Sequence, residues 1–139
     1  MEKEKFVGRW RLLSHEFTTS EGKVFKPYGE NAVGEVMFSP HGRFSAQIMR
    51  CDRKITEHAP TTDEIKKAYF GYVAYFGRFE VDEEKKMLVN HVEGALNPAW
   101  VGGVQIRYYE FEGDKIILRT DPIERGGVTI VGKLVWEPA

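Results

Sequence analysis

The second half of the chain alternates apolar and polar residues almost without interruption, and this pattern constrains the fold most. A period of two indicates half-buried strands, and it predicts five of them, at 72–81, 87–96, 104–112, 115–120 and 128–137. Their short connections favour antiparallel neighbours. A further strand within 6–17 and a hairpin over 34–50 raise the number to seven or more. The sequence therefore predicts a mainly β fold with one short helix, either a closed antiparallel barrel or a sandwich.

The one predicted helix lies between the two groups of strands. Thr61 and Glu64 have the spacing of a capping box, in which a hydroxyl and a carboxylate satisfy the first free amides of a helix. The helix should end near Gly71. The aromatic stretch over 69–77 either lines a pocket or, as we expect, forms core and lid, because an amphipathic helix that closes a barrel end needs such residues.

Composition and charge exclude several classes of protein. The chain has 139 residues, with 20 Lys and Arg against 21 Asp and Glu, a net charge of −1 and a pI of about 6.4. Nucleic-acid binding needs a basic face, which this balance does not provide. The length predicts a single domain over residues 1–139, and the lone Cys51 cannot form an internal disulfide. No apolar stretch is long enough for a signal peptide or a membrane span, so we expect a cytoplasmic protein without membrane partners.

Metal and cofactor sites have little support in the sequence. None of the four histidines has metal-site spacing with another histidine or with Cys51, and the Gly-Gly pairs at 102–103 and 126–127 are typical of turns rather than phosphate loops. We therefore expect no metal and no cofactor. A haem held by one inward histidine stays open on residue types alone.

A two-residue turn at 113–114 sets the register of the strands around it, because it pairs Tyr109 with Leu118 and Arg107 with Thr120. One face of the resulting sheet is apolar apart from Arg107. The face comprises Arg107, Tyr109, Phe111, Ile116, Leu118 and Thr120, joined by Val128, Ile130, Leu134 and Trp136 of the last strand.

The strand predicted at 87–96 adds two more polar residues to this face. Folding about Trp100 places Glu93 opposite Arg107, with His91 opposite Tyr109. An inward Glu93 beside Arg107 should be paired, because an unpaired buried charge is costly. The pair is either a structural ion pair that fixes the register or a site for proton transfer or ligand binding. His91 is likewise either a hydrogen-bonded core residue or a base.

Two other strands add side chains to the predicted interior. A turn near 83–84 brings Tyr75 and Phe79 close to Val89 and Glu93. On the strand before the helix, two alternating sets are candidates for the inner face. Either Ser45, Gln47 and Met49 or Phe44, Ala46 and Ile48 face inward, and the pattern alone leaves both open.

A series of motifs runs along nearly the whole chain. They are Gly8-Arg9-Trp10 with its continuation to Ser14, 40–50, 72–77, 91–94, Asn97-Pro98 with Trp100-Val101-Gly102, and 134–137. In this order they resemble the bacterial and fungal lipocalin-like domain family, and Gly-x-Trp looks like the motif of calycin barrels whose Trp plugs the closed end. The resemblance implies a single small antiparallel barrel with an internal cavity for an apolar or amphiphilic small molecule.

The resemblance also carries residue positions. The family-pattern positions that this chain retains are Ser45, Gln47, His91, Glu93, Asn97, Trp100 and Arg107. Some relatives accompany natural-product pathways in which cyclisation or isomerisation is suspected. The chain lacks the signal peptide and the disulfide of the secreted lipocalins, so we do not expect an extracellular carrier.

These observations give three functional hypotheses. The first is binding of a small hydrophobic or amphiphilic molecule that contains a carbonyl or an acid, with Arg107 and Gln47 as polar anchors. The remaining predicted ligand contacts are Ser45, Tyr75, Phe79, Trp100, Tyr109, Phe111, Leu118 and Ile130.

The alternative is a cofactor-free isomerase, cyclase or dehydratase of a polyketide-like substrate, in which Glu93 or His91 moves a proton and Arg107 stabilises an oxyanion. The third is a barrel that serves mainly as a scaffold or homodimer.

Overall fold

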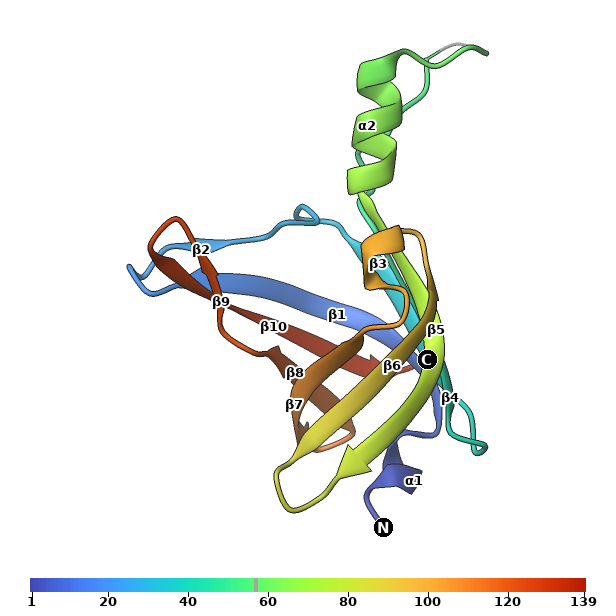
Figure 1. The fold of residues 1–139 in the computed structure, drawn as a ribbon, viewed down its shortest axis with the longest axis vertical. Coiled ribbons are helices and arrows are strands. Elements are labelled where there is room, and N and C mark those ends of the chain that lie inside the picture. The colour runs from blue at the N-terminus through green and yellow to red at the C-terminus, as the bar shows by residue number, and fades with distance from the viewer. Residues whose placement is uncertain (57) are drawn as a thin grey trace.

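The computed structural model of the chain, which describes residues 1–56 and 58–139, is a closed β-barrel (Figure 1). Its strands are β1 (Gly8–Thr19), β2 (Val24–Phe25), β3 (Val33–Phe38), β4 (Arg43–Met49), β5 (Tyr72–Asp82), β6 (Met87–Ala95), β7 (Val104–Glu112), β8 (Lys115–Thr120), β9 (Ile123–Arg125) and β10 (Val128–Pro138). Eight antiparallel strands close the ring in the order β1-β3-β4-β5-β6-β7-β8-β10, with β10 paired to β1. The short β2 and β9 extend the sheet beside β1 and β10. The prediction of a barrel is confirmed.

The five strands predicted from residue 72 onward begin and end within one residue of the predicted bounds, and the short β9 was not predicted. The β7–β8 hairpin also has the predicted register, with Arg107 opposite Thr120 and Tyr109 opposite Leu118. Gly113, at φ 62°, provides the left-handed backbone that a tight two-residue turn needs. Local turn chemistry therefore determined this part of the fold.

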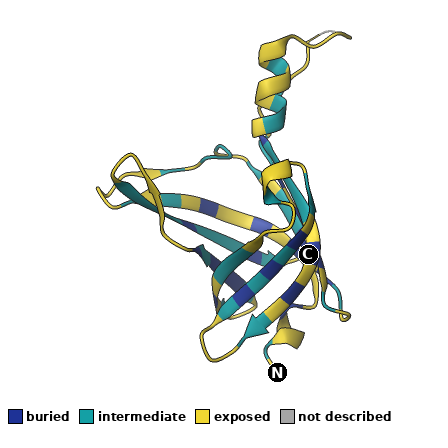
Figure 2. Cartoon of the chain, in the orientation of Figure 1, coloured by how far each residue is buried: buried dark blue, intermediate teal, exposed yellow. Residues whose placement is uncertain are grey.

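The N-terminal residues close one end of the barrel. The short helix α1 (Lys3–Phe6) ends at Phe6, which is completely buried. The Phe6 ring meets those of Phe38, Tyr109 and Phe111 edge-on, with centroids 5.5, 5.1 and 5.2 Å away. The indole N–H of Trp10 donates to the carbonyl oxygen of Phe6 (2.7 Å). This aromatic cluster fills the end of the barrel where the N-terminus lies, and the buried residues line the strands around it (Figure 2).

The helix α2 (Thr62–Phe70) forms where the capping box predicts it. The Thr61 hydroxyl accepts from the N–H of Glu64 (3.1 Å), and the Glu64 carboxylate accepts from the N–H of Thr61 (3.0 Å). The helix nevertheless projects away from the barrel, and none of its residues is buried (Figures 1 and 2). The expectation that it forms a lid is wrong, because α2 runs directly into β5 and extends beyond the barrel. Neither α2 nor any other helix in the described part of the chain is long and apolar enough to cross a membrane.

The register between β5 and β6 differs from the prediction by one residue. Asp82 pairs with Met87 across residues 83–86, a connection one residue longer than the predicted register requires. Phe79 therefore lies opposite Asn90, and Val89 lies on the outer face. A slip of one residue exchanges the two faces of a strand, so Asn90 is buried in the interior instead.

The register between β6 and β7 also differs from the predicted register. The predicted register places Glu93 opposite Arg107 and His91 opposite Tyr109, but in the structure Leu88 lies opposite Arg107. Glu93 and His91 consequently point to the outer surface, and no ion pair forms between Glu93 and Arg107. The β6–β7 ladder ends at the pair His91–Val104, and the 3₁₀ turn η1 (Pro98–Trp100) lies in the connection beyond this pair.

Candidate functional site

The interior of the barrel holds a cavity of about 80 Å³. Its apolar walls come from Val36, Phe38, Ala46, Ile48, Val73, Leu88, Leu118 and Leu134. Aromatic rings and a few polar side chains complete the lining: Phe17, Tyr28, Tyr75, Trp100 and Trp136, with Asn90, Gln105, Arg107 and Thr120. A largely apolar cavity with a small number of placed polar groups is the usual form of a small-molecule site.

The four polar side chains come from neighbouring strands and share one wall. Asn90 on β6 lies opposite Gln105 on β7, and Arg107 on β7 lies opposite Thr120 on β8. Gln105 and Arg107 face the same side because they are two residues apart on one strand. One wall of the otherwise apolar cavity is therefore polar.

Arg107 is the charged residue of this wall. Its Nη2 donates to Oε1 of Gln105 (3.1 Å) and its Nη1 to the carbonyl oxygen of Ile106 (2.9 Å). Within residues 1–56 and 58–139, no carboxylate lies at ion-pair distance from Arg107. Both acceptors are neutral, so the positive charge of this partly buried guanidinium is not balanced by an acidic side chain that the structure describes.

Two buried polar atoms on the cavity have no hydrogen-bond partner among the described residues. They are Oδ1 of Asn90 and Nε1 of Trp136, in residues that are 5% and 4% exposed. Leaving such a group unpaired costs on the order of 1–3 kcal/mol, and native proteins pair nearly all of them with protein or water. These atoms are available to a molecule that enters the cavity.

Aromatic rings line the cavity on the side of η1, which lies at the end of the barrel away from α1 (Figure 1). Trp100, in η1, packs edge-on against Tyr75 with centroids 5.6 Å apart, and the side chain of Asn97 caps η1. Tyr28 reaches the cavity from the loop between β2 and β3, and burial raises the pKa of its phenol. The backbone N–H of Tyr28 donates to Nε2 of the buried His15 (3.1 Å), which fixes the loop on β1.

The buried His15 predicts a pH dependence of stability. Burial, reinforced by the charge of Lys26, lowers the pKa of His15. As the pH falls through about 6.5, the unfolded chain binds a proton that the folded chain does not, so the free energy of unfolding decreases. We expect a decrease between pH 7.5 and 5.5 in urea denaturation, and a smaller decrease for His15→Gln, which keeps an acceptor but does not titrate. Equal decreases in the two proteins would show that His15 is not the group responsible.

The predicted interior residues fall in two places. Tyr75, Trp100, Arg107 and Leu118 line the cavity. Phe79, Tyr109 and Phe111 instead belong to the aromatic cluster around Phe6, below the cavity. Ile130 lies near the start of β10, between β1 and β9, and does not line the cavity.

Among the cavity residues with polar side-chain atoms, sequence reasoning did not identify Tyr28, Asn90 and Gln105. Two of them follow from alternation once the register is known. Gln105 is two residues from Arg107, and Asn90 lies between the buried Leu88 and Val92. Tyr28 lies in a loop, where the sequence carries no periodic signal.

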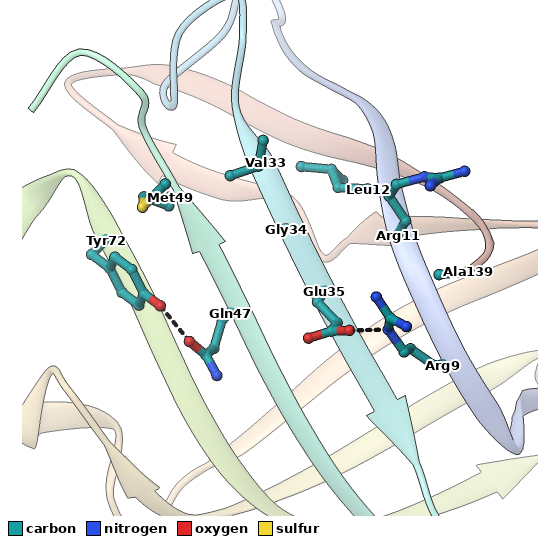
Figure 3. Close-up of a pocket in the computed structure, with 10 residues that line it drawn as sticks. All are labelled: Arg9, Arg11, Leu12, Val33, Gly34, Glu35, Gln47, Met49, Tyr72 and Ala139. Atoms are coloured by element: carbon teal, nitrogen blue, oxygen red, sulfur yellow. Dashed lines mark hydrogen bonds and ion pairs between the residues drawn. The ribbon is translucent and has the colours of Figure 1, made fainter.

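The structure shows which of the two alternating sets of side chains on β4 faces the interior. Phe44, Ala46 and Ile48 are buried, so Ser45 and Gln47 point outward and cannot contact a ligand in the cavity. Gln47 instead lines a groove of about 370 Å³ on the outer surface, where its side chain accepts a hydrogen bond from the Tyr72 hydroxyl (Figure 3). Arginine–glutamate contacts border this groove.

Glu93 and His91 have partners on the outer surface. The Glu93 carboxylate accepts two hydrogen bonds from the guanidinium of Arg43 (2.8 and 3.0 Å), which holds the pKa of Glu93 below its ordinary value. Nε2 of His91 lies 3.1 Å from Oε2 of Glu80. Neither residue lines the cavity, so neither can transfer a proton to a molecule bound there. Among the residues that the structure describes, His, Cys, Asp and Glu form no group of three or more that could hold a metal ion.

A solved structure and a family model are both similar to this chain. The crystal structure of a lipocalin-like protein from Bacteroides uniformis has 14% sequence identity and a TM-score of 0.49, covering 97% of this chain and 99% of that chain. No curated protein matches the sequence. The lipocalin-like domain family matches residues 7–139, which confirms the resemblance found in the motifs. The chain belongs to the lipocalin-like domain family, whose barrel indicates binding of small molecules in general.

Proposed function

We propose that the chain binds a small amphiphilic molecule with an acid or carbonyl group inside the barrel, with Arg107 as the anchor. The observation that carries this proposal is the inward guanidinium of Arg107, which contacts neutral oxygens and faces the cavity. Guanidinium groups bind carboxylates and other oxygen acceptors strongly, because their hydrogen bonds are charge-assisted.

Six of the eight other arginines support this interpretation by contrast. Six arginines on the outside of the barrel each form an ion pair with a carboxylate: Arg9, Arg11, Arg43, Arg50, Arg78 and Arg119. Arg107 is set in a mostly apolar cavity, where an unbalanced charge is costly. A ligand oxygen would remove that cost, and the apolar walls suit the rest of an amphiphilic molecule.

The enzymatic alternative has less support. It assigns acid–base chemistry to Glu93 and His91, which lie on the outer surface beside Arg43 and Glu80. No carboxylate and no histidine is among the described side chains that line the cavity. Proton transfer needs such a group within hydrogen-bond reach of the substrate, so the arrangement favours binding. The cavity itself favours binding over a packed scaffold.

Substitution of Arg107 by methionine should remove most of the ligand affinity. Methionine keeps the length and apolar contacts of the side chain but provides no donor, so we expect at least about a tenfold loss of affinity. The measurement is native mass spectrometry of protein purified gently from its own host, with the bound molecule released and identified and its affinity then measured for each variant. Arg119→Met, on the outer face of the neighbouring β8, is the matched control and should bind like the parent protein. Unchanged affinity in Arg107→Met would make Arg107 structural.

A further inference from the structure

The two unpartnered polar atoms indicate which polar group, besides an acid, the ligand carries. Oδ1 of Asn90 and Nε1 of Trp136 both lie on the cavity, and both are buried. They come from β6 and β10, which are separated in the ring by β7 and β8. The unpaired groups therefore come from strands that are not neighbours, line one cavity and are not a single local defect.

Other buried polar side chains of the barrel do have partners. Oγ1 of Thr120 accepts from the N–H of Gly132 (2.9 Å), Nε2 of His15 accepts from Tyr28, and Nε1 of Trp10 donates to Phe6. The fold thus satisfies these buried groups, including Thr120, which itself lines the cavity. The two exceptions among the described residues both line the space that Arg107 faces.

The chemistry of the two atoms restricts what can pair with them. The indole N–H only donates, whereas the amide oxygen only accepts. A hydroxyl group does both, so it is the simplest ligand group that can satisfy them. A carboxylate only accepts, and it is the group that suits Arg107.

The size of the cavity restricts the ligand further. At about 80 Å³ it is roughly five to eight times the space of about 10–15 Å³ that a single water molecule needs. A long acyl chain does not fit this space, whereas an acid of a few carbon atoms does.

We propose that the ligand class is a short hydroxy acid, whose carboxylate binds Arg107 and whose hydroxyl pairs with Asn90 and Trp136. This inference rests on the proposed function and deepens it. Asn90 and Trp136 become specificity-determining residues, because they distinguish a hydroxylated acid from the same acid without the hydroxyl. A site built to bond a hydroxyl rejects a ligand that lacks it, since the buried polar groups are then left unpaired.

The test compares butyrate with 2-, 3- and 4-hydroxybutyrate, which keep the chain length and move the hydroxyl. Each acid is titrated into the full ¹⁵N-labelled chain, and binding is followed by NMR. We expect at least one hydroxybutyrate to bind about fivefold or more tightly than butyrate. We also expect the indole N–H resonance of Trp136, assigned by its loss in Trp136→Phe, to move with that hydroxy acid and not with butyrate.

Variants separate the specificity from the overall affinity. Asn90→Leu has a similar shape and removes an unpaired polar group, so it should fold but lose the preference for the hydroxy acid over butyrate. It also keeps the proposal testable if Trp136→Phe does not fold. Gln47→Leu makes the same kind of change on the outer surface and should keep the preference.

The outcomes distinguish this inference from the proposed function. Butyrate and all three hydroxybutyrates binding equally well, and losing affinity together in Arg107→Met, would overturn the hydroxy-acid inference and leave the acid site in place. Failure of all four acids to bind would overturn the short-acid class, while the molecule released in native mass spectrometry still tests Arg107 as an anchor. A preference that persists in Asn90→Leu and leaves the Trp136 resonance unmoved would also overturn the inference.

Discussion

Replacement of Phe6 by alanine is expected to lower the free energy of unfolding by about 3–5 kcal/mol, the range for loss of a buried phenylalanine. Phe6 is completely buried and packs edge-on against three aromatic rings at the closed end of the barrel. Alanine would leave a space that the surrounding strands cannot fill, since the barrel is closed by hydrogen bonds around its whole circumference. Urea denaturation followed by tryptophan fluorescence measures the loss, with Trp10 adjacent to the site as a reporter.

Phe70→Ala is the matched control for Phe6→Ala. Phe70 ends the projecting helix α2 and is 74% exposed, so its loss should change the free energy of unfolding by no more than about 0.5 kcal/mol. A loss below about 1 kcal/mol in Phe6→Ala would show that the N-terminal helix is not part of the folded core in solution. The two variants remove the same side chain, and burial is the difference between them.

The sequence predicts those parts of the fold that depend on a few adjacent residues. The β7–β8 hairpin is correct to the residue because a tight glycine turn leaves one register. The helix α2 is correct because Thr61 and Glu64 satisfy its first amides regardless of the rest of the chain. Its direction relative to the barrel depends instead on contacts that no local pattern encodes, and this is where the prediction of a lid is wrong.

In the candidate site, too, the correct predictions depend on adjacent residues and the wrong ones depend on the pairing of distant residues. Arg107 lies inside because it alternates with Tyr109 from a turn whose geometry is local. Glu93 lies outside because the connection over 83–86 is one residue longer than predicted, and because Glu93 itself is an extra residue in the β5–β6 pairing. Strand alternation amplifies such small differences, since one added residue exchanges the two faces. Asn90, the β6 residue that shares the polar wall with Arg107, could therefore not be identified before the register of β6 was known.

The bulge at Glu93 depends on a glycine in the opposite strand, and Gly77→Ala should therefore be strongly destabilising. The pairing shifts between Phe76 and Gly77, and a β-carbon added at Gly77 would overlap the backbone carbonyl oxygen of His91. Backbone cannot move aside without breaking the β5–β6 ladder, so we expect a loss of about 3 kcal/mol or more in the free energy of unfolding. Urea denaturation of the variant and the parent protein measures this difference.

Gly94→Ala is the control, because it places a methyl group in the same bulge against a side chain rather than backbone. The β-carbon there would meet the ring of Phe76, which is 49% exposed and can rotate into solvent. We expect a loss below about 1 kcal/mol for Gly94→Ala. Equal losses in the two variants would mean that the β6 register does not depend on Gly77. In that case the outward position of Glu93 would be due to the connection over 83–86 alone.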